Sequence, residues 1–462
     1  MLVNLSTHDL RVRDRDHHLH PFTDHGAFGL DKRRVITRAD GVYLWDSEGN
    51  RIIDGMAGLW CVNIGHGRQE IVEAVRAQMS ELSYYNTFFK TTHRPVIDLS
   101  CQLAEIAPKH INMVFYGGSG SDANDTVMRM VRTYWALLGK PEKSVIIARK
   151  NAYHGSTMAG ASLGGMAAMH AQGDLPIPGI HHIDQPYWFG EGMQSGLSEA
   201  EFGRHAARAL ERAIDEIGEH RIAAFIAEPI QGAGGVIIPP ETYWPEVRRI
   251  LAERDILFVS DEVICGFGRT GKWFGCELYE MNADLMPIAK GLSSGYLPIG
   301  AVLVSDRIAD ILHGQGAEFF HGYTYSGHPA ACAAALANLK IMLRERLVER
   351  VEHEIGPYFQ KRWLALGDHP LVGEARMTGL VGALELVPDK RQLLHRFEPV
   401  GTVGTLARDH SLNNGLVMRA VRDSLIISPP LIISEDETDA LIALVEKTLD
   451  DTWHALKKQG MI

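Results

Sequence analysis

The sequence predicts an α/β protein with a large domain, built on a mixed but mostly parallel sheet, and a smaller α+β domain. Short, continuous apolar runs recur along the middle of the chain, as in strands that are covered on both faces. Helical patterns separate these runs, and the alternation changes near residue 340. We therefore expect an N-terminal arm and part of the small domain in residues 1–70, the large domain in 71–340 and the rest of the small domain in 341–462.

Five segments are expected to form strands of the large sheet: residues 112–116, 145–149, 223–229, 256–263 and 299–305. Each is short and rich in apolar side chains, which fits a sheet with helices on both faces. In open α/β sheets, ligands bind beyond the carboxyl ends of the strands. The residues that end or follow these segments are therefore the candidates for a functional site.

Two helices are recognised by their ends. Ser198 and Glu201 form a capping-box pattern, apolar residues then recur on one face, and Gly218 closes the helix. Ser434 and Glu437 repeat the pattern at the start of an amphipathic helix in the C-terminal tail. These helices frame the predicted α/β region and the predicted α+β tail.

Composition excludes several classes of protein. The 462 residues include 46 Lys+Arg and 57 Asp+Glu, and the net charge of -11 argues against a nucleic-acid partner. No apolar run approaches the roughly 20 residues of a membrane span, and the N-terminus lacks the apolar core of a signal peptide. The five cysteines contain no CxxC and suit a reducing cytoplasm. The 22 histidines show no HExxH or paired spacing, so we expect no metal site.

A glycine-rich segment, GGSGSDAND at 117–125, lies between a predicted strand and a helix. Glycines let backbone amides approach an anion, and the start of the helix adds positive potential. A phosphate cradle with Gly120 and Ser121 as contacts is one interpretation, and a tight turn is another.

The same glycine-rich segment also matches GxGxxA, a dinucleotide-binding fingerprint, through Gly118, Gly120 and Ala123. That motif expects an acidic residue at the end of the next strand. The chain has Arg149 and Lys150 there. A cofactor with a 2′-phosphate would still be compatible, so dinucleotide binding stays open.

Two charged residues stand out against apolar surroundings. Asp261 lies at the end of the predicted strand 256–263, where a carboxylate needs a cation to offset its desolvation, and a glycine-rich segment, GFGRTG, follows as a loop that we expect to be flexible. Lys290 is the only formal charge between Asp284 and Asp306. A lysine kept from water has a lowered pKa and becomes nucleophilic.

A phosphate cradle, a strand-end aspartate and a desolvated lysine are three anchors of pyridoxal phosphate. The lysine forms a Schiff base with the cofactor, and the aspartate keeps the pyridine nitrogen protonated. Tyr153, which follows the strand 145–149, offers an aromatic face for the ring.

The chain resembles the class III pyridoxal-phosphate aminotransferases of fold type I along nearly its whole length. Within that class it is most similar to the ω-transaminases that use pyruvate, especially the bacterial putrescine (polyamine):pyruvate aminotransferases. The motifs that support the resemblance are HHLHPFTDH, GVYLWDSEGN, DGMAGLWCVN, YYNTFFKTTH, SGSDANDTVMRMVR, YHGSTMAGASLGGM, IAEPIQGAGGV, DEVICGFGRTG, DLMPIAKGLSSGYLPIG, HGYTYSGHP and NGLVMRA.

The resemblance implies roles for the cofactor site. Lys290 would bind the cofactor covalently and move the substrate proton, while Asp261 would pair with the ring nitrogen. Tyr153 and Val263 would cover the two ring faces. The phosphate would be held by Gly120, Ser121 and, from a neighbouring subunit, Tyr323 and Thr324.

The resemblance also implies a homodimer with shared sites, alone or paired into a tetramer. Trp60, Phe88 and Phe89 would line an aromatic substrate entrance, and Arg419 would bind the carboxylate of a keto acid. The implied reaction is a ping-pong transfer of an amino group from a primary amine or diamine, such as putrescine, to pyruvate. Its products are an aldehyde and alanine.

Two departures from related enzymes bear on the substrate. Relatives that use 2-oxoglutarate carry a glutamate where this chain has Ala233, so Arg419 is expected to be freer to move. Arg422 adds a second cation close to Arg419 and disfavours a second ammonium there. β-Alanine, taurine and 4-aminobutyrate therefore stay open as donors. The sequence is also compatible with a decarboxylase or aminomutase, with a non-catalytic protein on the same fold and with a dinucleotide-binding protein.

Overall fold

The computed structural model describes residues 5–314 and 318–462. Its largest sheet has seven strands in the order β4-β10-β9-β8-β7-β5-β6. The neighbours from β9 to β6 run parallel, whereas β10 is antiparallel to both β4 and β9. The mixed, mostly parallel sheet that the sequence predicts is therefore confirmed. Its strands are β4 (Ile111–Gly117), β5 (Val145–Arg149), β6 (Ile180–Ile183), β7 (Ile222–Ala227), β8 (Leu257–Ser260), β9 (Leu285–Ile288) and β10 (Gly300–Ser305).

Alternate side chains of the central strands pack into different layers. Ile146 and Ala148 of β5 join a cluster with the helix α5 (Gly120–Leu137). Ile147, between them, joins a second cluster with α8 (Glu199–Ile217) and α9 (Tyr243–Ala252). Because side chains alternate along a strand, apolar residues at every position mean that helices cover both faces.

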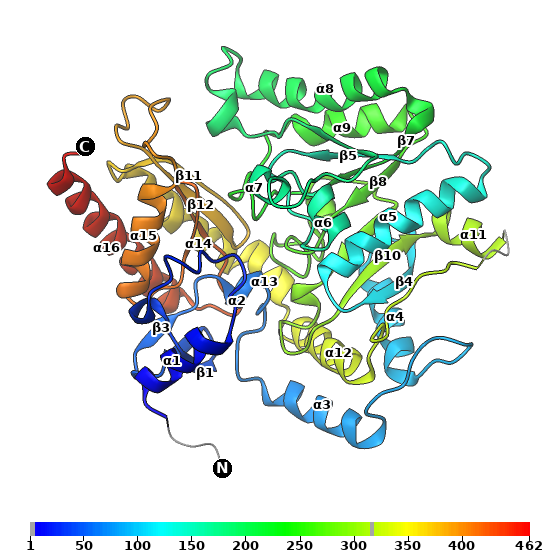
Figure 1. Cartoon of the computed structure of the whole chain (residues 1–462), viewed down its shortest axis with the longest axis horizontal. Helices are drawn as coiled ribbons and strands as arrows, with labels where there is room; N and C mark the ends of the chain where they lie inside the picture. Colours follow the sequence, from blue (N-terminus) through cyan, green and yellow to red (C-terminus); the bar gives the residue numbers. More distant parts are fainter. Residues whose placement is uncertain (1–4, 315–317) are drawn as a thin grey trace.

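The remaining helices surround the sheet and build the rest of the chain (Figure 1). The predicted capping boxes start α8 and the C-terminal helix α16, and Gly218 closes α8. The α-helices whose bounds have not yet been given are α1 (Thr7–His17), α2 (Ala57–Trp60), α3 (Gln69–Glu81), α4 (Arg94–Ile106), α6 (Met158–Leu163), α7 (Ala167–His170), α10 (Gly275–Leu278), α11 (Asp306–Gly314), α12 (Pro329–Arg344), α13 (Leu347–His353), α14 (Ile355–Ala365), α15 (Thr402–Asn413) and α16 (Glu435–Gln459).

Both ends of the chain build the smaller part of the molecule, on the left of Figure 1. The N-terminal part supplies a sheet of β1 (Ile36–Asp40), β2 (Tyr43–Asp46) and β3 (Arg51–Ile53), and the C-terminal part supplies a sheet of β11 (Val372–Thr378), β12 (Val381–Leu386), β13 (Arg419–Val421) and β14 (Ser424–Ile427). Backbone hydrogen bonds join them: Ile53 N–H donates to Gly415 at 2.9 Å and Val417 N–H donates to Ile53 at 2.9 Å. A small α+β part from both ends is thus confirmed. Domain limits at 70 and 340 stay a prediction.

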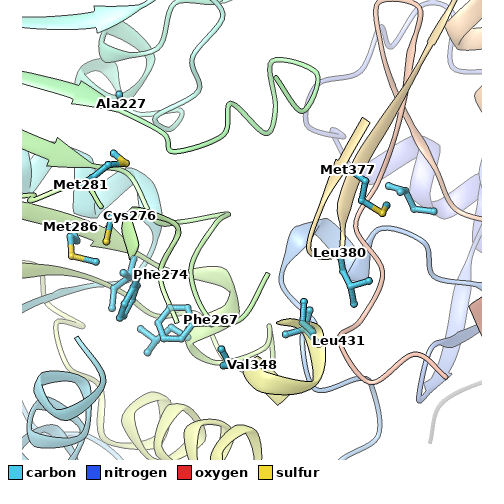
Figure 2. Packing of buried hydrophobic residues seen from close by; sticks show 14 of the residues in the cluster. Ala227, Phe267, Phe274, Cys276, Met281, Met286, Val348, Met377, Leu380 and Leu431 are labelled. Carbon is cyan, nitrogen blue, oxygen red and sulfur yellow. The ribbon is translucent and has the colours of Figure 1, made fainter. Parts of the chain in front are cut away.

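A continuous core joins the large and small parts. Figure 2 shows apolar side chains following one another from Phe274 and Phe267 through Val348 to Leu431 and Leu380. Phe267 belongs to the GFGRTG segment, and every residue of that segment is buried.

The expected flexibility of the GFGRTG segment is wrong. Its Arg269 donates from Nη1 to the Leu380 carbonyl at 3.0 Å and to that of Pro429, and from Nη2 to Asn63 Oδ1 at 2.9 Å. A buried cation with these bonds ties the large part to the small one. Glycines here allow tight packing, because a Cβ on Gly271 would lie 3.1 Å from the backbone of Glu352.

Two further expectations from the sequence concern membrane spans and disulfides. In the part of the chain that the structure describes, no helix combines the length and the apolarity needed to cross a membrane. All five cysteines are free, and three of them, Cys265, Cys276 and Cys332, are buried.

Candidate active site

A cavity of about 110 Å³ lies beyond the carboxyl ends of the parallel strands. Tyr153 follows β5, Glu228 follows β7, Asp261 follows β8 and Lys290 follows β9. Strand β8 ends at Ser260, so Asp261 lies just past the strand rather than at its last position. The cavity is lined by Gly120, Ser121, Asn124, Tyr153, His154, Gly155, Glu228, Asp261, Val263, Ile264, Ala289 and Lys290.

Lys290 faces this cavity from the turn after β9. Its backbone has a φ of 45°, and the turn is held by a hydrogen bond from Leu292 N–H to the Ala289 carbonyl at 2.9 Å. Burial lowers the pKa of the Lys290 ammonium, while the nearby Asp261 carboxylate acts in the opposite direction. No hydrogen bond or ion pair to the Lys290 amine is found among residues 5–314 and 318–462. The amine is therefore available to a ligand.

The Asp261 carboxylate is held by three donors. Oδ2 accepts from His154 Nδ1 at 2.7 Å and from Asn124 Nδ2 at 2.9 Å, and Oδ1 accepts from Val263 N–H at 3.1 Å. Asp261 is only 3% exposed. Such bonds fix the direction of a buried carboxylate. The sequence-based prediction missed His154 and Asn124, although both lie inside motifs that carry the resemblance.

The amino end of α5 borders the cavity. Ser119 caps this helix by accepting from Asp122 N–H at 3.1 Å. The first amides of a helix lack partners within it, so those of Gly120 and Ser121 can serve an anion. Space is tight here: a Cβ on Gly120 would lie 3.1 Å from the Val263 methyls, and one on Gly155 would lie 2.7 Å from Ser121 Oγ.

Tyr153 is fixed at the cavity by its backbone and its hydroxyl. Its N–H donates to Glu228 Oε1 at 3.2 Å, and its hydroxyl lies 3.0 Å from Ser156 Oγ. The Phe22 ring of the N-terminal arm lies 6.4 Å from the Tyr153 ring. Phe22 was also missed, because an exposed aromatic residue in a polar arm shows nothing of this long-range contact.

Arg419 and Trp60 lie on the side of the small domain. Arg419 starts β13, and burial lowers the pKa of its guanidinium. Within the described residues no side-chain partner of Arg419 is found. Trp60 is buried in an apolar cluster with Val236 and Ile264, and Ile264 lines the cavity.

Four predicted residues lie away from this cavity within one chain. The Tyr323 hydroxyl donates to the Asp122 carbonyl at 3.0 Å, and the Thr324 carbonyl accepts from the Tyr84 hydroxyl at 2.6 Å. Phe88 lines a separate cavity of about 310 Å³, and Phe89 is 89% exposed. The structure of a single chain does not bring these residues to Lys290.

The described residues contain one grouping of potential metal ligands, Asp14, His18 and His20. Arg33 Nη1 lies 2.6 Å from Asp14 Oδ2, which also lies 2.8 Å from His20 Nε2. A guanidinium on the shared carboxylate opposes a second cation at that point. This arrangement explains the grouping as a hydrogen-bonded cluster of the N-terminal arm.

The cavity residues fit pyridoxal phosphate. An amine at Lys290, a carboxylate at Asp261, an aromatic face at Tyr153 and the amides at the start of α5 match its aldehyde, ring nitrogen, ring and phosphate. Two buried polar atoms at the cavity, His154 Nε2 and Asn124 Oδ1, have no partner among the described residues. Gly120 and Gly155 leave room for a ligand at positions where a larger residue would fill the cavity.

Comparisons with known proteins agree with this chemistry. The putrescine–pyruvate aminotransferase of Pseudomonas aeruginosa is 59% identical over 98% of both chains. An (S)-enantioselective ω-transaminase from Thermomicrobium roseum superposes with a TM-score of 0.92 at 41% identity and covers 97% of this chain and 99% of its own. The ω-transaminase of Pseudomonas jessenii, solved with PMP, gives a TM-score of 0.94 at 40% identity over 97% of this chain and 99% of its own. The model of the family "Aminotransferase class-III" matches residues 29–449, and the chain therefore belongs to the class III aminotransferases, which depend on pyridoxal phosphate.

Proposed function

We propose that this aminotransferase moves an amino group from a primary amine or diamine of the putrescine type to pyruvate. The products are an aldehyde and alanine, formed in a ping-pong sequence. The observation that best supports transamination is the unpartnered Lys290 amine, which lines the same cavity as Asp261. The 59% identity to a putrescine–pyruvate aminotransferase supports the type of donor and acceptor.

When bound, pyridoxal phosphate supplies an aldehyde that reacts with amines and a ring that accepts the electron pair released at the substrate carbon. Lys290 would hold the cofactor through Nζ, and the same amine would hold and move the proton of the substrate carbon. Its lowered pKa keeps more of the amine neutral near pH 7, which both tasks require. Asp261 would pair with the protonated ring nitrogen, and His154 and Asn124 keep its carboxylate in place.

The remaining cavity residues orient the cofactor. Tyr153 and Val263, which line the cavity, would cover the two faces of the ring, and the amides of Gly120 and Ser121 would hold the phosphate at the start of α5. Asp261 and Glu228 are buried at this end of the cavity. Charge interactions are stronger there than in water, because the surroundings are less polarisable.

At the substrate end, Arg419 binds the carboxylate of pyruvate, and Trp60 shapes the apolar wall. Ala233 offers no carboxylate that would occupy Arg419. An unpaired arginine suits both a keto acid, which it binds, and an amine without a carboxylate, from which it moves away. A dinucleotide has no support here, because the Arg149 that its phosphate would need is buried and donates to the Glu228 carbonyl.

The proposal includes a homodimer in which Tyr323 and Thr324 reach the phosphate of the partner, while Phe88 and Phe89 reach its substrate entrance. The exposed aromatic side chains of two neighbouring segments support it. The rings of Tyr84 and Tyr325 lie 5.8 Å apart, and Phe89 is 89% exposed. Such a surface is typical of a protein interface. Two dimers could further pair into a tetramer.

Sharing of sites is testable by mixing two inactive variants. The double variant Tyr323→Phe, Thr324→Val should bind the cofactor phosphate poorly, and Lys290→Ala should not turn over. If the residues act on the partner, a mixed dimer holds one intact site, so refolding the two variants together should restore up to about half the activity per mixed dimer. Activity that stays absent in the mixture would show that they act within their own chain.

A cytoplasmic location and the domain limits 1–70, 71–340 and 341–462 are also part of the proposal. Five free cysteines support a reducing compartment. The separation of the seven-stranded sheet from the four-stranded sheet of β11 to β14 supports a limit between them.

The deciding experiment follows the visible absorption of the purified holoenzyme. Putrescine should bleach the band of the bound cofactor, and pyruvate should restore it with formation of alanine. Cadaverine, 4-aminobutyrate, β-alanine and taurine tested in parallel identify the preferred donor. A band that ignores putrescine but responds to one of the carboxylated donors would overturn the amine assignment.

A lysine variant tests the catalytic assignment with a matched control. Lys290→Ala should lose turnover and the covalent attachment of the cofactor that borohydride reduction and mass spectrometry detect. Lys150→Ala removes a lysine that pairs with Asp184 at 2.6 Å on the exposed surface, and it should behave like the wild type. Turnover by Lys290→Ala at the wild-type rate would refute the mechanism.

A further inference from the structure

The glycine-rich loop 232–236 packs behind the wall of the active-site cavity, against residues that line it. Gly232 N–H donates to Glu228 Oε2 at 2.9 Å, and a Cβ on Gly232 would lie 2.7 Å from the Ile264 side chain. Glu228 and Ile264 both line the cavity. A Cβ on Gly234 would lie 2.7 Å from the Asn151 carbonyl. One side of the loop is thus packed against residues that line or adjoin the cavity.

Two arginines of the small domain bind the other side of this loop. Arg376 of β11 donates from Nε to the Val236 carbonyl at 2.7 Å and from Nη2 to the Gly235 carbonyl at 2.6 Å. Arg422 donates from Nη2 to the Gly234 carbonyl at 3.3 Å. Three consecutive carbonyls are therefore held by guanidinium groups that belong to another sheet.

A buried network fixes the first of these arginines. Arg376 Nη2 lies 2.7 Å from Glu385 Oε1, and Glu385 also accepts from the Tyr187 hydroxyl and, at 2.7 Å, from Ser424 Oγ. Both guanidinium groups lie over the Tyr187 ring, at 5.4 Å for Arg376 and 5.7 Å for Arg422. The two cations thus share one aromatic support, and among the described residues Arg376 alone is paired with acids, Glu385 and Glu374.

Arg422 stands in a turn that is directly connected to Arg419. Val421 of β13 pairs with Ser424 of β14, so Arg422 and Asp423 form the two-residue turn between these strands. The φ of Arg422 is 55°, a left-handed conformation in which glycine is normally favoured. A residue other than glycine at this position strains the backbone, which indicates that the guanidinium has a function.

We infer that Arg376 and Arg422 form a clamp that positions the substrate end of the active site. They fix the loop 232–236 relative to the strand that presents Arg419. Arg422 is the adjustable half, because it is less embedded than Arg376, and both are positioning residues, since neither lines the cavity. The inference rests on the proposed function, in which Arg419 binds the keto acid.

In the described part of the chain, the clamp has no hydrogen bond to the groups that hold Asp261, and the loop is connected to the cofactor side through Glu228, which accepts from Gly232 N–H at 2.9 Å and from Tyr153 N–H at 3.2 Å. The partners of Asp261 are Asn124, His154 and Val263, and none of them bonds to loop 232–236 or to Arg422 among the described residues. By contrast, Val236 and Val421 share an apolar cluster with Trp60. Loosening the loop therefore changes the binding of substrate before it changes the binding of cofactor.

The test replaces Arg422 by glycine, which removes the guanidinium and the backbone strain together. Holoenzyme Arg422→Gly should keep its cofactor absorption and its kcat, while the KM values for amine and pyruvate rise about fivefold, the loss expected for one hydrogen bond. Hydrogen exchange of amides 232–236 should become faster. Arg422→Lys, which keeps a donor at this position, should restore most of the wild-type KM.

Arg346→Gly is the matched control. Arg346 also has a left-handed φ of 50°, but it lies before α13, and its side chain has no hydrogen bond to the described residues. It should leave KM and exchange of the loop unchanged. Unaltered KM and loop exchange in Arg422→Gly would overturn the clamp, as would a loss of thermal stability with no change in either. A wild type that turns over none of the amine and keto-acid pairs would instead refute the proposed function, while the exchange measurement would still test the clamp.

Discussion

Replacing Asp261 by asparagine should nearly abolish transamination while the protein stays folded. Asparagine has the same shape but no charge, so the ring nitrogen of the cofactor loses its counter-ion. The substitution also disturbs the local hydrogen bonds. All three groups that point at the carboxylate are donors, from His154, Asn124 and the Val263 backbone, so the new amide must turn its own N–H₂ toward one of them.

The two effects differ in size. Two unit charges about 4 Å apart attract each other by about 4 kcal/mol at an effective dielectric constant of about 20. Loss of that attraction corresponds to roughly a thousandfold decrease in rate, at about 1.4 kcal/mol for each factor of ten. The mismatched donor should cost about 1–3 kcal/mol of the free energy of unfolding. The decrease in kcat should therefore exceed what the loss of stability can explain.

The assay compares kcat for alanine formation with urea unfolding of the same preparation. Asp284→Asn is the matched control, because Asp284 flanks the same sheet at β9 and accepts from Phe258 N–H at 2.9 Å, away from the cavity. It should lose stability and keep its kcat. An Asp261→Asn enzyme that retains the cofactor and turns over within about tenfold of the wild type would refute the role of the charge.

Three further predictions follow from other contacts. Because burial lowers the pKa of Lys290, the unfolded apoenzyme binds more protons than the folded one between that lowered pKa and 10.5, so its free energy of unfolding should rise with pH across this window. Lys290→Met should show a smaller slope of unfolding free energy against pH in urea titrations, and equal slopes would contradict the lowered pKa. Gly155→Ala should weaken cofactor binding at least tenfold, since its Cβ would lie 2.7 Å from Ser121 Oγ. Gly139 also has a positive φ, 72° against 129° at Gly155, but nothing lies within 4 Å of its Cβ position, so Gly139→Ala should only lower the melting temperature slightly; equal cofactor affinities would exclude the clash. Arg269→Met should cost about 2–4 kcal/mol of the free energy of unfolding, because it leaves the carbonyls of Leu380 and Pro429 unpaired. A cost below about 1 kcal/mol in urea unfolding would show that the small domain does not depend on these hydrogen bonds.

Much of the large sheet could be predicted because buried parallel strands have a simple pattern. The apolar runs at 145–149 and 299–305 correspond closely to β5 and β10. Strand β9 was missed, although Lys290 follows it directly. It has four residues and includes Pro287, which is unfavourable inside a strand because it lacks an N–H donor. Strand β6 was missed as well, since IHHI is polar at its centre.

The site could be predicted where single residues have distinctive surroundings in the sequence. Lys290 and Asp261 were found because isolated charges among apolar residues need a reason. Glu228 was missed, since its position beyond β7 matters only once β7 and β8 lie side by side. In the proposed dimer, the cofactor contact of Tyr323 lies in a second chain, so no pattern within one chain can place it.

Backbone conformation sets a further limit on prediction, and four residues at or near the proposed active site illustrate it. Trp60, Val236, Lys290 and Arg422 all have φ values between 45° and 66°, in the left-handed region that side chains other than glycine rarely adopt. Local propensity therefore argues against the conformation that each residue has. Only long-range packing can impose it, and such strain is concentrated where a fold holds reactive groups in place. The same packing that makes these residues unpredictable from the sequence aims the Lys290 amine and fixes the wall around it, so relaxing the strain at Arg422 should change substrate binding rather than merely stabilise the turn.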